Sequence, residues 1–244
     1  GTASSAAQAG THNFKRISAS NTYGFSIVQF SASDNGNYPT GLQTTPDFVL
    51  FKDIDAGQWW RVYHSGMTSG LSGGKTLYLN QDYDESTDNC RVTAVNSTTF
   101  TVGDLTNNDD YIAYIWSERE GFSKFGTFSH DGSSGQTLDF GFVPRWWLVK
   151  EKDGNTNWYI FDATRDNFDD PFFAETNGNA SSGWGFTFSG TSVTWVGGSF
   201  AAGNYIYAAF AESAAGEEFE SHLVDQLNLD DLSGNSNNAS NAGA

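Results

Sequence analysis

The sequence predicts an all-β protein made of two tandem related units of the β-sandwich or jelly-roll type, with a short C-terminal helix. Three observations lead to this prediction. Short aromatic and β-branched runs recur between clusters of Gly, Asn, Asp and Ser, a pattern typical of strands joined by turns. Aromatic residues make up 16% of the 244 residues, which suits thin cores filled by large side chains. Blocks of similar sequence also recur in the same order in the second half of the chain.

Three pairs of equivalent residues mark the two copies: Pro46 and Pro144, Trp60 and Trp158, and Tyr111 and Tyr205. The first two pairs are 98 positions apart and the third pair is 94 apart. The length changes fall in loops rich in Gly, Asn and Asp, so the period fits a whole β-domain rather than a small solenoid unit. Two similar copies favour a scaffold or binding surface over a catalytic site, because each copy can present the same face.

Four segments are expected in order along the chain. Residues 1–20 are polar and are expected to form an extended arm, with Phe14 and Ile17 as its only apolar anchors. Residues 21–120 and 121–213 are expected to be the two β units, and residues 214–244 a short helix with a tail rich in Gly, Asn and Ser. The strands of the first unit are expected at residues 25–30, 48–51, 59–63, 76–79, 99–102 and 111–116. Those of the second unit are expected at residues 124–128, 137–142, 146–150, 158–161, 185–188, 193–196 and 205–210.

The helix itself is expected over residues 213–227. Its apolar stripe at helical spacing consists of Phe219, Leu223, Val224 and Leu227. Acidic residues at 217 and 218 lie near the positive end of its dipole. Packing on the second unit is the favoured role, and contact with a neighbouring subunit is the alternative.

The bulk composition limits the classes of partner. Twelve basic and 29 acidic residues give a formal net charge of −17, a field that repels nucleic acid and anionic membranes. No apolar run approaches the ~18 residues that cross a membrane. The single cysteine, Cys90, excludes an internal disulfide. Only 17% of residues are charged, so the surface depends on Ser, Thr, Asn and Gly, as in extracellular or virion proteins.

No residue set in the chain meets the requirements of a reaction, so we expect no enzyme and no catalytic residues. Ser72 lies in the letters G-x-S-x-G, but a strand follows it where that motif needs a helix. Glu118 and Glu212 are equivalent residues of two units, and such residues rarely share one cleft as a glycosidase requires. His64 and Asp162 are also equivalent, and their different identities suggest polar residues at strand ends.

Two acidic loops are weak candidates for calcium, which prefers several oxygen ligands from one loop. The candidate ligands are Asp82, Asp84 and Asp88 in the first loop, and Asp166, Asp169 and Asp170 in the second. Neither loop has the D-x-D-x-D-G pattern, and acidic loops arise unaided in a chain of this charge. We therefore expect turn residues and no obligatory cofactor or metal.

Two double tryptophans, at 59–60 and 146–147, are candidates for contact with a partner. Neighbouring strand residues point to opposite faces, so at least one of each pair is expected in the core. The other, Trp59 or Trp146, is then available for a protein interface or for stacking on a glycan.

Several blocks together resemble a repeat domain of unknown detailed role found in virion and tail-fibre proteins of marine tailed phages. The blocks are P-D-F-V-L-F-K, W-R-V-Y-H-S, Y-I-A-Y-I-W-S-E, G-F-S-K-F-G and Y-I-Y-A-A-F-A-E. The likeness covers about residues 24–213, with Arg145 and Asp162 as departures in the second copy. The resemblance implies a virion structural protein and no catalytic residues.

The combined prediction is a non-catalytic bacteriophage protein exposed on the particle, as a tail or tail-fibre subunit or as a capsid decoration or fibre protein. Its expected partners are further copies of itself in a homo-oligomer, other virion proteins and host-surface glycan. The alternative is a lectin-like module that binds host glycan, and a polysaccharide-degrading enzyme ranks third. Exposed tryptophans flanked by Asn and Asp would favour the lectin, whereas buried apolar faces between chains would favour assembly.

Overall fold

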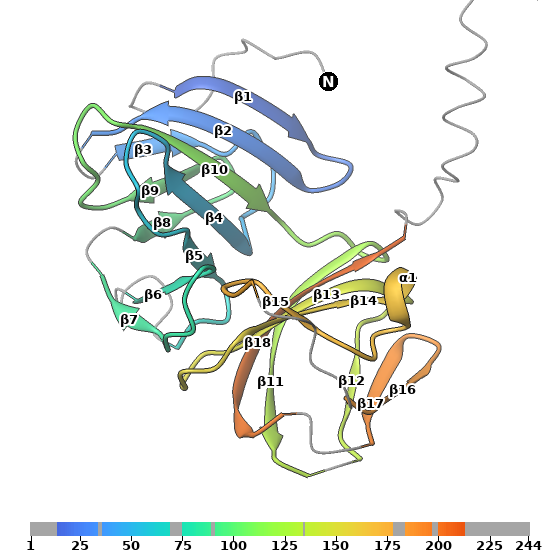
Figure 1. Ribbon diagram of the computed structural model, residues 1–244. Coiled ribbons are helices and arrows are strands. Elements are labelled where there is room, and N and C mark those ends of the chain that lie inside the picture. The colour runs from blue at the N-terminus through green and yellow to red at the C-terminus, as the bar shows by residue number, and fades with distance from the viewer. Residues whose placement is uncertain are drawn as a thin grey trace, which may run out of the picture.

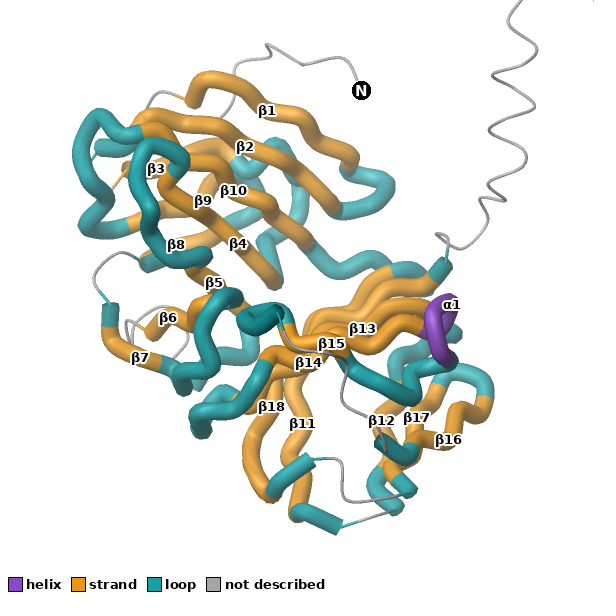
Figure 2. Tube along the Cα trace, viewed as in Figure 1, coloured by secondary structure: helices purple, strands orange, loops and turns teal. Residues whose placement is uncertain are grey.

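The computed structural model describes residues 14–33, 36–68, 75–88, 91–133, 135–177, 184–196 and 200–212. Within these ranges the regular structure consists of strands β1–β18 and one helical turn, α1 (Ala163–Asp166). The prediction of an all-β fold is therefore confirmed. Figures 1 and 2 show two groups of sheets packed together. We call β1–β10 the first unit, and β11–β18 with α1 the second unit.

The first unit is a sandwich of two antiparallel sheets. Its large sheet has the order β1 (Phe14–Ser20), β2 (Phe25–Ser31), β10 (Asp110–Trp116), β4 (Phe48–Asp53), β5 (Arg61–His64), β6 (Lys75–Tyr78) and β7 (Ser86–Thr87). Its small sheet has the order β3 (Gly36–Pro39), β9 (Thr99–Val102) and β8 (Val92–Val95). Aromatic rings join the two sheets, since Phe30 in β2 lies 3.9 Å from Tyr38 in β3 and 5.8 Å from Phe100 in β9 between ring centroids.

The second unit repeats this plan with fewer strands. Its large sheet has the order β11 (Ser123–Asp131), β18 (Ala202–Ala211), β13 (Pro144–Glu151), β14 (Trp158–Asp162) and β15 (Phe172–Phe173). Its small sheet has the order β12 (Thr137–Asp139), β17 (Ser192–Trp195) and β16 (Phe186–Ser189). A buried cluster that includes Trp147, Phe161 and Trp195 fills the space between these two sheets.

Four strands have the same order and register in both units: β2, β10, β4 and β5 in the first, and β11, β18, β13 and β14 in the second. In the first unit β10 lies between β2 and β4, and Tyr111 is opposite Phe30 and Asp53. In the second unit β18 lies between β11 and β13. The equivalent residue Tyr205 is opposite Phe128 and Glu151, each 98 positions after its counterpart. The matching register supports the interpretation as two related units, and the boundary at residue 120 stays a prediction.

The large sheet of the second unit is buried on both faces. Trp147, Val149 and Phe161 face the small sheet of their own unit. Leu148, between Trp147 and Val149 in β13, and Ile206 in β18 point the other way and belong to the core cluster of the first unit. The alternation of side chains along a strand explains this division, and it explains why both faces of β13 and β18 are apolar.

Several elements differ from the sequence-based expectations, which did not include the short strands β3, β7, β8 and β15. Residues 14–20, which the sequence assigns to the arm, form the edge strand β1 paired with β2. Ile17 is its only buried residue, so the strand carries almost no hydrophobic pattern. The loop at 163–170 contains the helical turn α1, which Asp162 caps by accepting from the N–H groups of Thr164 and Arg165. Residues 1–13 and the expected helix at 213–227 lie outside the described residues.

Candidate functional site

The two units meet along a cleft with wholly apolar walls. Its volume is about 140 Å³. The residues that line it are Phe48, Leu50, Leu79, Trp116, Phe125, Trp146, Leu148, Ile160, Ala174, Ala208 and Phe210. We call this feature the inter-unit cleft. Such a cleft favours an apolar side chain or another hydrophobic group, because no polar group is available to orient a polar ligand.

The repeat explains how both units supply the same kind of wall. Along β4, Val49 and Phe51 point into the sandwich and are fully buried, so Phe48 and Leu50 face the cleft. The equivalent strand β13 presents Trp146 and Leu148 to the cleft from the other side. Trp116 in β10 and Phe210 in β18 are equivalent in the same way.

His64 connects the two units beside the cleft. Its Nδ1 accepts a hydrogen bond from the N–H of Gly66 (2.9 Å), so Nε2 carries the proton and donates to the carbonyl of Tyr207 (3.0 Å). The ring is fully buried. Burial lowers the pKa of His64 from 6.5 to about 4, against the opposing effect of the Tyr207 hydrogen bond. The imidazole is therefore neutral at pH 7 and acts as a structural link.

Two further hydrogen bonds join the two units beside the cleft. We call this line of hydrogen bonds, together with that of His64, the seam. The indole N–H of Trp158 donates to the carbonyl of Tyr78 (2.8 Å), and the N–H of Glu85 donates to the carbonyl of Lys152 (2.8 Å). The seam thus combines apolar packing with satisfied backbone groups.

A buried lysine lies at one end of the seam. Lys150 is fully buried, and its Nζ donates to the carbonyls of Glu151 (2.6 Å) and Gly154 (2.9 Å). Burial lowers the pKa of Lys150 to about 8, while acidic neighbours that include Glu151 and Glu175 oppose this effect. Burial also raises the pKa of Glu175. The ammonium group is satisfied mainly by backbone carbonyls, so it serves to close the hairpin between β13 and β14.

An exposed aromatic patch lies on the first unit, and we define it as Trp59, Tyr78 and Tyr83. Trp59 is 42% exposed and Tyr83 is 39% exposed, whereas Tyr78 is buried. The ring of Trp59 packs edge-on at 4.9 Å from Tyr78 and 5.8 Å from Tyr83 between centroids. The exposed residues Asp82 and Asp84 flank Tyr83 in sequence. The second unit anchors this loop, because the side chain of Asn155 accepts from the N–H of Asp84 (3.0 Å).

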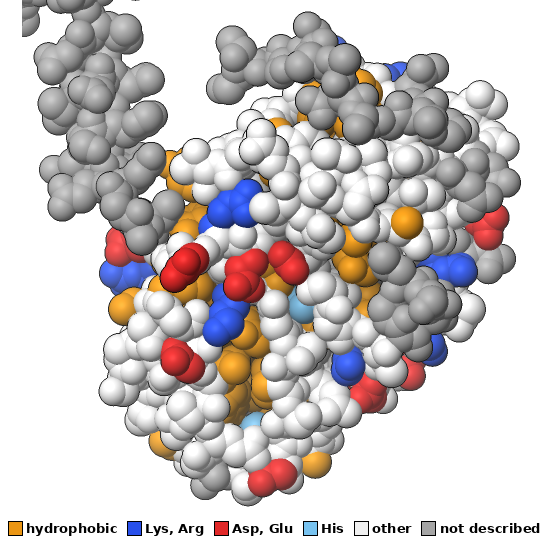
Figure 3. Space-filling view, turned by 180° about the vertical axis from the view of Figure 1, so that it is seen from behind, with side chains coloured by type: hydrophobic (Ala, Val, Ile, Leu, Met, Phe, Trp, Pro, Cys, Tyr) orange, Lys and Arg blue, Asp and Glu red, His pale blue; other side chains and the backbone are white. Residues whose placement is uncertain are grey.

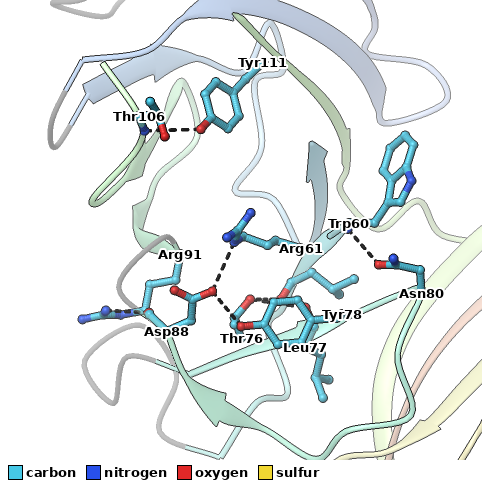
Figure 4. A network of polar contacts seen from close by, with 11 residues as sticks. Trp60, Arg61, Thr76, Leu77, Tyr78, Asn80, Asp88, Arg91, Thr106 and Tyr111 are labelled. Carbon is cyan, nitrogen blue, oxygen red and sulfur yellow. Dashed lines mark hydrogen bonds and ion pairs between the residues drawn. The ribbon is translucent and has the colours of Figure 1, made fainter. Parts of the chain in front are cut away.

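The calcium candidate Asp88 is engaged by protein donors. Figure 4 shows its carboxylate between Arg61 and Tyr78. One oxygen of Asp88 accepts from the Tyr78 hydroxyl (2.6 Å) and from Nε of Arg61 (3.2 Å). Burial, together with the hydrogen bond to Asp88, raises the pKa of Tyr78 to about 12, so the phenol stays protonated and continues to donate.

The other calcium candidates are not gathered around one point. Asp166 accepts from Arg165 (2.7 Å) and from the N–H of Asp170 (3.2 Å). Asp82, Asp84 and Asp169 are exposed. Among the described residues there is no cluster of three or more His, Cys, Asp or Glu side chains that could hold a metal.

The remaining candidate residues have structural contacts or lie outside the described ranges. Glu118 donates its N–H to Asp47 (2.8 Å), and Glu212 pairs with Arg145 (2.6 Å). Equivalent positions are thus in contact in both units, through a backbone hydrogen bond to Asp47 in the first and through an ion pair with Arg145 in the second. Ser72 and Cys90 lie outside the described residues.

The tryptophan pairs behave differently in the two units. Trp147 is fully buried, as expected for one member of its pair, and Trp146 is half-buried in the wall of the cleft. For the first pair the expectation of one core residue is wrong: Trp59 is exposed and Trp60 is half-buried, because both precede β5 and are not in a strand with alternating faces. Figure 3 shows that hydrophobic side chains also reach the surface in a furrow on the opposite side of the molecule from Figure 1, beside acidic and basic residues.

Comparison with protein families gives one match. The family described as Domain of unknown function (DUF7483) matches residues 1–214. The chain belongs to this family. No significant match was found among curated proteins or among solved structures. Within the described residues of this DUF7483 protein, no helix is long and apolar enough to span a membrane.

The sequence identified Trp59 and Trp146 as candidate contact residues, but it did not identify the cleft or the buried Lys150. The cleft had a signal in the apolar residues on both faces of β13. That pattern identifies a strand buried on both sides, but it does not identify which part of the chain covers each side.

Proposed function

We propose that this chain is a structural component of a bacteriophage virion, exposed on the particle as a tail, tail-fibre, capsid decoration or capsid fibre protein. The observation that carries the proposal is the repeated four-strand register in two units that a buried seam joins. Such an arrangement gives one stable body, which suits a structural component of a larger assembly. The resemblance of the sequence blocks to phage virion proteins supports the same role.

The charge and surface of the chain fit this location. A net charge of −17 opposes binding to nucleic acid and nonspecific association between particles. The proposed partners are further copies of the chain, other virion proteins and the host surface. The proposed role requires no catalysis and no cofactor.

Detection on the particle tests the proposal. Mass spectrometry of purified phage particles is expected to find the chain at a fixed copy number, and antibodies to it are expected to label particles in electron micrographs. A chain that is abundant in the lysate but absent from purified, infectious particles would contradict a virion role. An electron-microscopy map of the particle would then assign the chain to the tail, fibre or capsid.

The second candidate is carbohydrate binding, and the aromatic patch favours it. Trp59 and Tyr83 offer exposed ring surfaces, and the neighbouring Asp82 and Asp84 can accept hydrogen bonds from sugar hydroxyls. Edge contacts with the buried Tyr78 hold the ring of Trp59, which reduces the entropy lost on binding.

Titration calorimetry with cellohexaose, mannohexaose and chitohexaose tests this second candidate. The double variant Trp59→Ala/Tyr83→Ala is expected to lose binding at least tenfold. Phe172→Ala is the matched control, because Phe172 is equally exposed (42%) but lies under Arg165 on the second unit. Absence of binding to all three sugars, or equal losses in both variants, would count against a glycan site at the patch.

The non-catalytic role has its own test. The triple variant Ser72→Ala/Glu118→Ala/Glu212→Ala and the unmodified protein are both expected to leave host polysaccharide intact. Depolymerisation by the unmodified protein that the folded triple variant lacks would show that the chain is an enzyme.

A further inference from the structure

The first unit carries an edge strand that has no counterpart in the second unit. β1 pairs with the outer edge of β2 and is the terminal strand of its large sheet. Side-chain atoms of Ile17, which is buried, and of Ala19 lie 2.6 and 2.9 Å from the point where a Cβ on Gly41 would stand. β1 therefore closes the side of the first unit where β2 lies beside the turn that follows β3.

The equivalent position in the second unit is open among the described residues. β11 corresponds to β2 but is itself the terminal strand of its sheet, so no described strand pairs with its outer edge. Gly141 follows β12 at the same distance, and with the same left-handed backbone, as Gly41 follows β3. Nothing lies within 4 Å of the point where a Cβ on Gly141 would stand. The space that β1 fills on the first unit is thus free here.

Apolar side chains are incompletely covered at this opening. β11 and β12 are edge strands of the two sheets, and Nζ of Lys124 in β11 donates to the carbonyl of Asp139 in β12 (2.9 Å). Phe128 in β11 and Leu138 in β12 are only half-buried. Figure 3 shows hydrophobic side chains at the bottom of a furrow in the second unit, where Figure 1 places these two strands. Covering them is favourable in proportion to the apolar area removed from water.

The outer edge of β11 also presents backbone groups that can bind a strand. The N–H of Phe125 donates to the carboxylate of Glu118 (3.3 Å), so it points away from β18. Backbone groups alternate along an antiparallel strand, and those of Thr127 and Ser129 therefore point the same way. Both residues are exposed, and no described residue bonds their outward N–H and C=O groups. Such an edge is a template for one further strand.

The charges beside this edge favour a basic occupant. On the first unit Lys15 of β1 pairs with Asp110 of β10. The equivalent residue of β18 is Asn204, which accepts from the hydroxyl of Ser129 (2.7 Å) at the end of β11. The amide of Asn204 donates to Asp153 (2.6 Å), so an exposed carboxylate again lies beside the edge. A basic residue in an added strand would therefore find an acidic partner, as Lys15 does.

We propose that the outer edge of β11 binds an extended segment of a partner polypeptide as an additional strand, at the position that β1 occupies on the first unit. The segment is basic and places a small apolar side chain beside Gly141. Main-chain hydrogen bonds to Thr127 and Ser129 supply affinity, while side-chain contacts supply specificity. A separate polypeptide is favoured over β1 of a neighbouring copy, because that strand is already paired with its own β2. The inference goes beyond the proposed role on the particle and holds without it.

A peptide with the sequence of residues 14–20, the strand that fills the equivalent edge, is the probe. Titration calorimetry with the full chain is expected to show saturable one-to-one binding. Hydrogen–deuterium exchange is expected to slow about tenfold at the amides of Thr127 and Ser129, without change in β2. Absence of saturable binding would overturn the proposal, and so would protection that appears in β2 instead. Protection of Thr127 and Ser129 that grows with the concentration of the free chain would also overturn it, because the occupant would then be a second copy.

Two methylated forms of the peptide separate strand pairing from charge attraction. In β1 the amides of Arg16 and Ser18 face β2, and those of Ile17 and Ala19 face away. N-methylation at 16 and 18 is expected to weaken binding about tenfold, because two main-chain hydrogen bonds are lost. Methylation at 17 and 19 is the matched control, expected to leave the affinity unchanged. Equal affinities of the two methylated peptides would overturn the addition of a strand.

A substitution in the full chain tests the charge of the occupant. Asp153→Asn keeps an acceptor for Asn204 but removes the negative charge, and it is expected to weaken binding of the peptide about threefold. Asp169→Asn, in the exposed loop after α1, is the matched control and is expected to change nothing. Equal effects of the two substitutions would overturn the assignment of a basic occupant.

Discussion

Lowering the pH from 7 to 4 is expected to lower the free energy of unfolding by about 3 kcal/mol through the protonation of His64 alone. In the folded protein the pKa of His64 is lowered from 6.5 to about 4, chiefly by burial. Between these pH values the unfolded chain binds a proton that the folded protein excludes, so folding becomes less favourable as the pH falls. Each pH unit in this window costs about 1.4 kcal/mol, and the interval from 6.5 to about 4 accounts for the expected total. Above pH 6.5 the contribution is constant.

The matched variant is His64→Gln. A glutamine amide can donate to the carbonyl of Tyr207 as the imidazole does, but it does not titrate. Urea unfolding followed by tryptophan fluorescence, in steps of half a pH unit, gives the free energy of unfolding for both proteins. The carboxylates contribute equally to both curves, so only the difference between the curves reports His64. We expect this difference to change by about 3 kcal/mol between pH 7 and pH 4.

Parallel stability curves for the two proteins would refute the reasoning. They would mean that His64 is protonated without cost in the folded state, and hence that its ring is not buried and neutral at the seam. A difference that develops only above pH 7 would refute the sign of the argument as well.

Three further predictions concern packing, hydrogen bonding and metals. Gly66→Ala would place its Cβ 2.2 Å from Cγ2 of Thr127 in the second unit, so we expect the free energy of unfolding, measured by thermal unfolding, to fall by about 1–3 kcal/mol. Adding Thr127→Ser removes Cγ2 and should restore it, and no recovery in the double variant would contradict the close approach. Trp158→Phe leaves the carbonyl of Tyr78 without its donor at 2.8 Å and should lower the free energy of unfolding by about 1–2 kcal/mol, whereas an unchanged value would indicate that water replaces the indole. A chelator should leave the melting temperature unchanged, because protein donors already bind Asp88, and a decrease that added calcium reverses would show a metal site.

The sequence by itself determined the secondary structure class and the positions of the strongly patterned strands. The runs around Phe48, Tyr111 and Tyr205 are short, rich in aromatic and β-branched residues and bounded by turn residues, so local pattern was sufficient. The edge strand β1 was missed because a strand at the border of a sheet buries one face at most, and there only Ile17 is buried. The turn α1 was missed because its helical geometry depends on one capping side chain, Asp162.

Only the tertiary structure decided which residues form sites. Trp59 and Trp146 occupy the same kind of dipeptide in sequence, yet one lies in an exposed patch and the other lines a cleft. The difference arises from the packing of one unit on the other, which involves contacts between residues about a hundred positions apart. The local pattern shows only that β13 is apolar on both faces, and it does not identify which part of the chain covers each face. The lowered pKa of His64 has the same origin, because burial causes it and the ring lies against Tyr207 and Phe125 of the other unit.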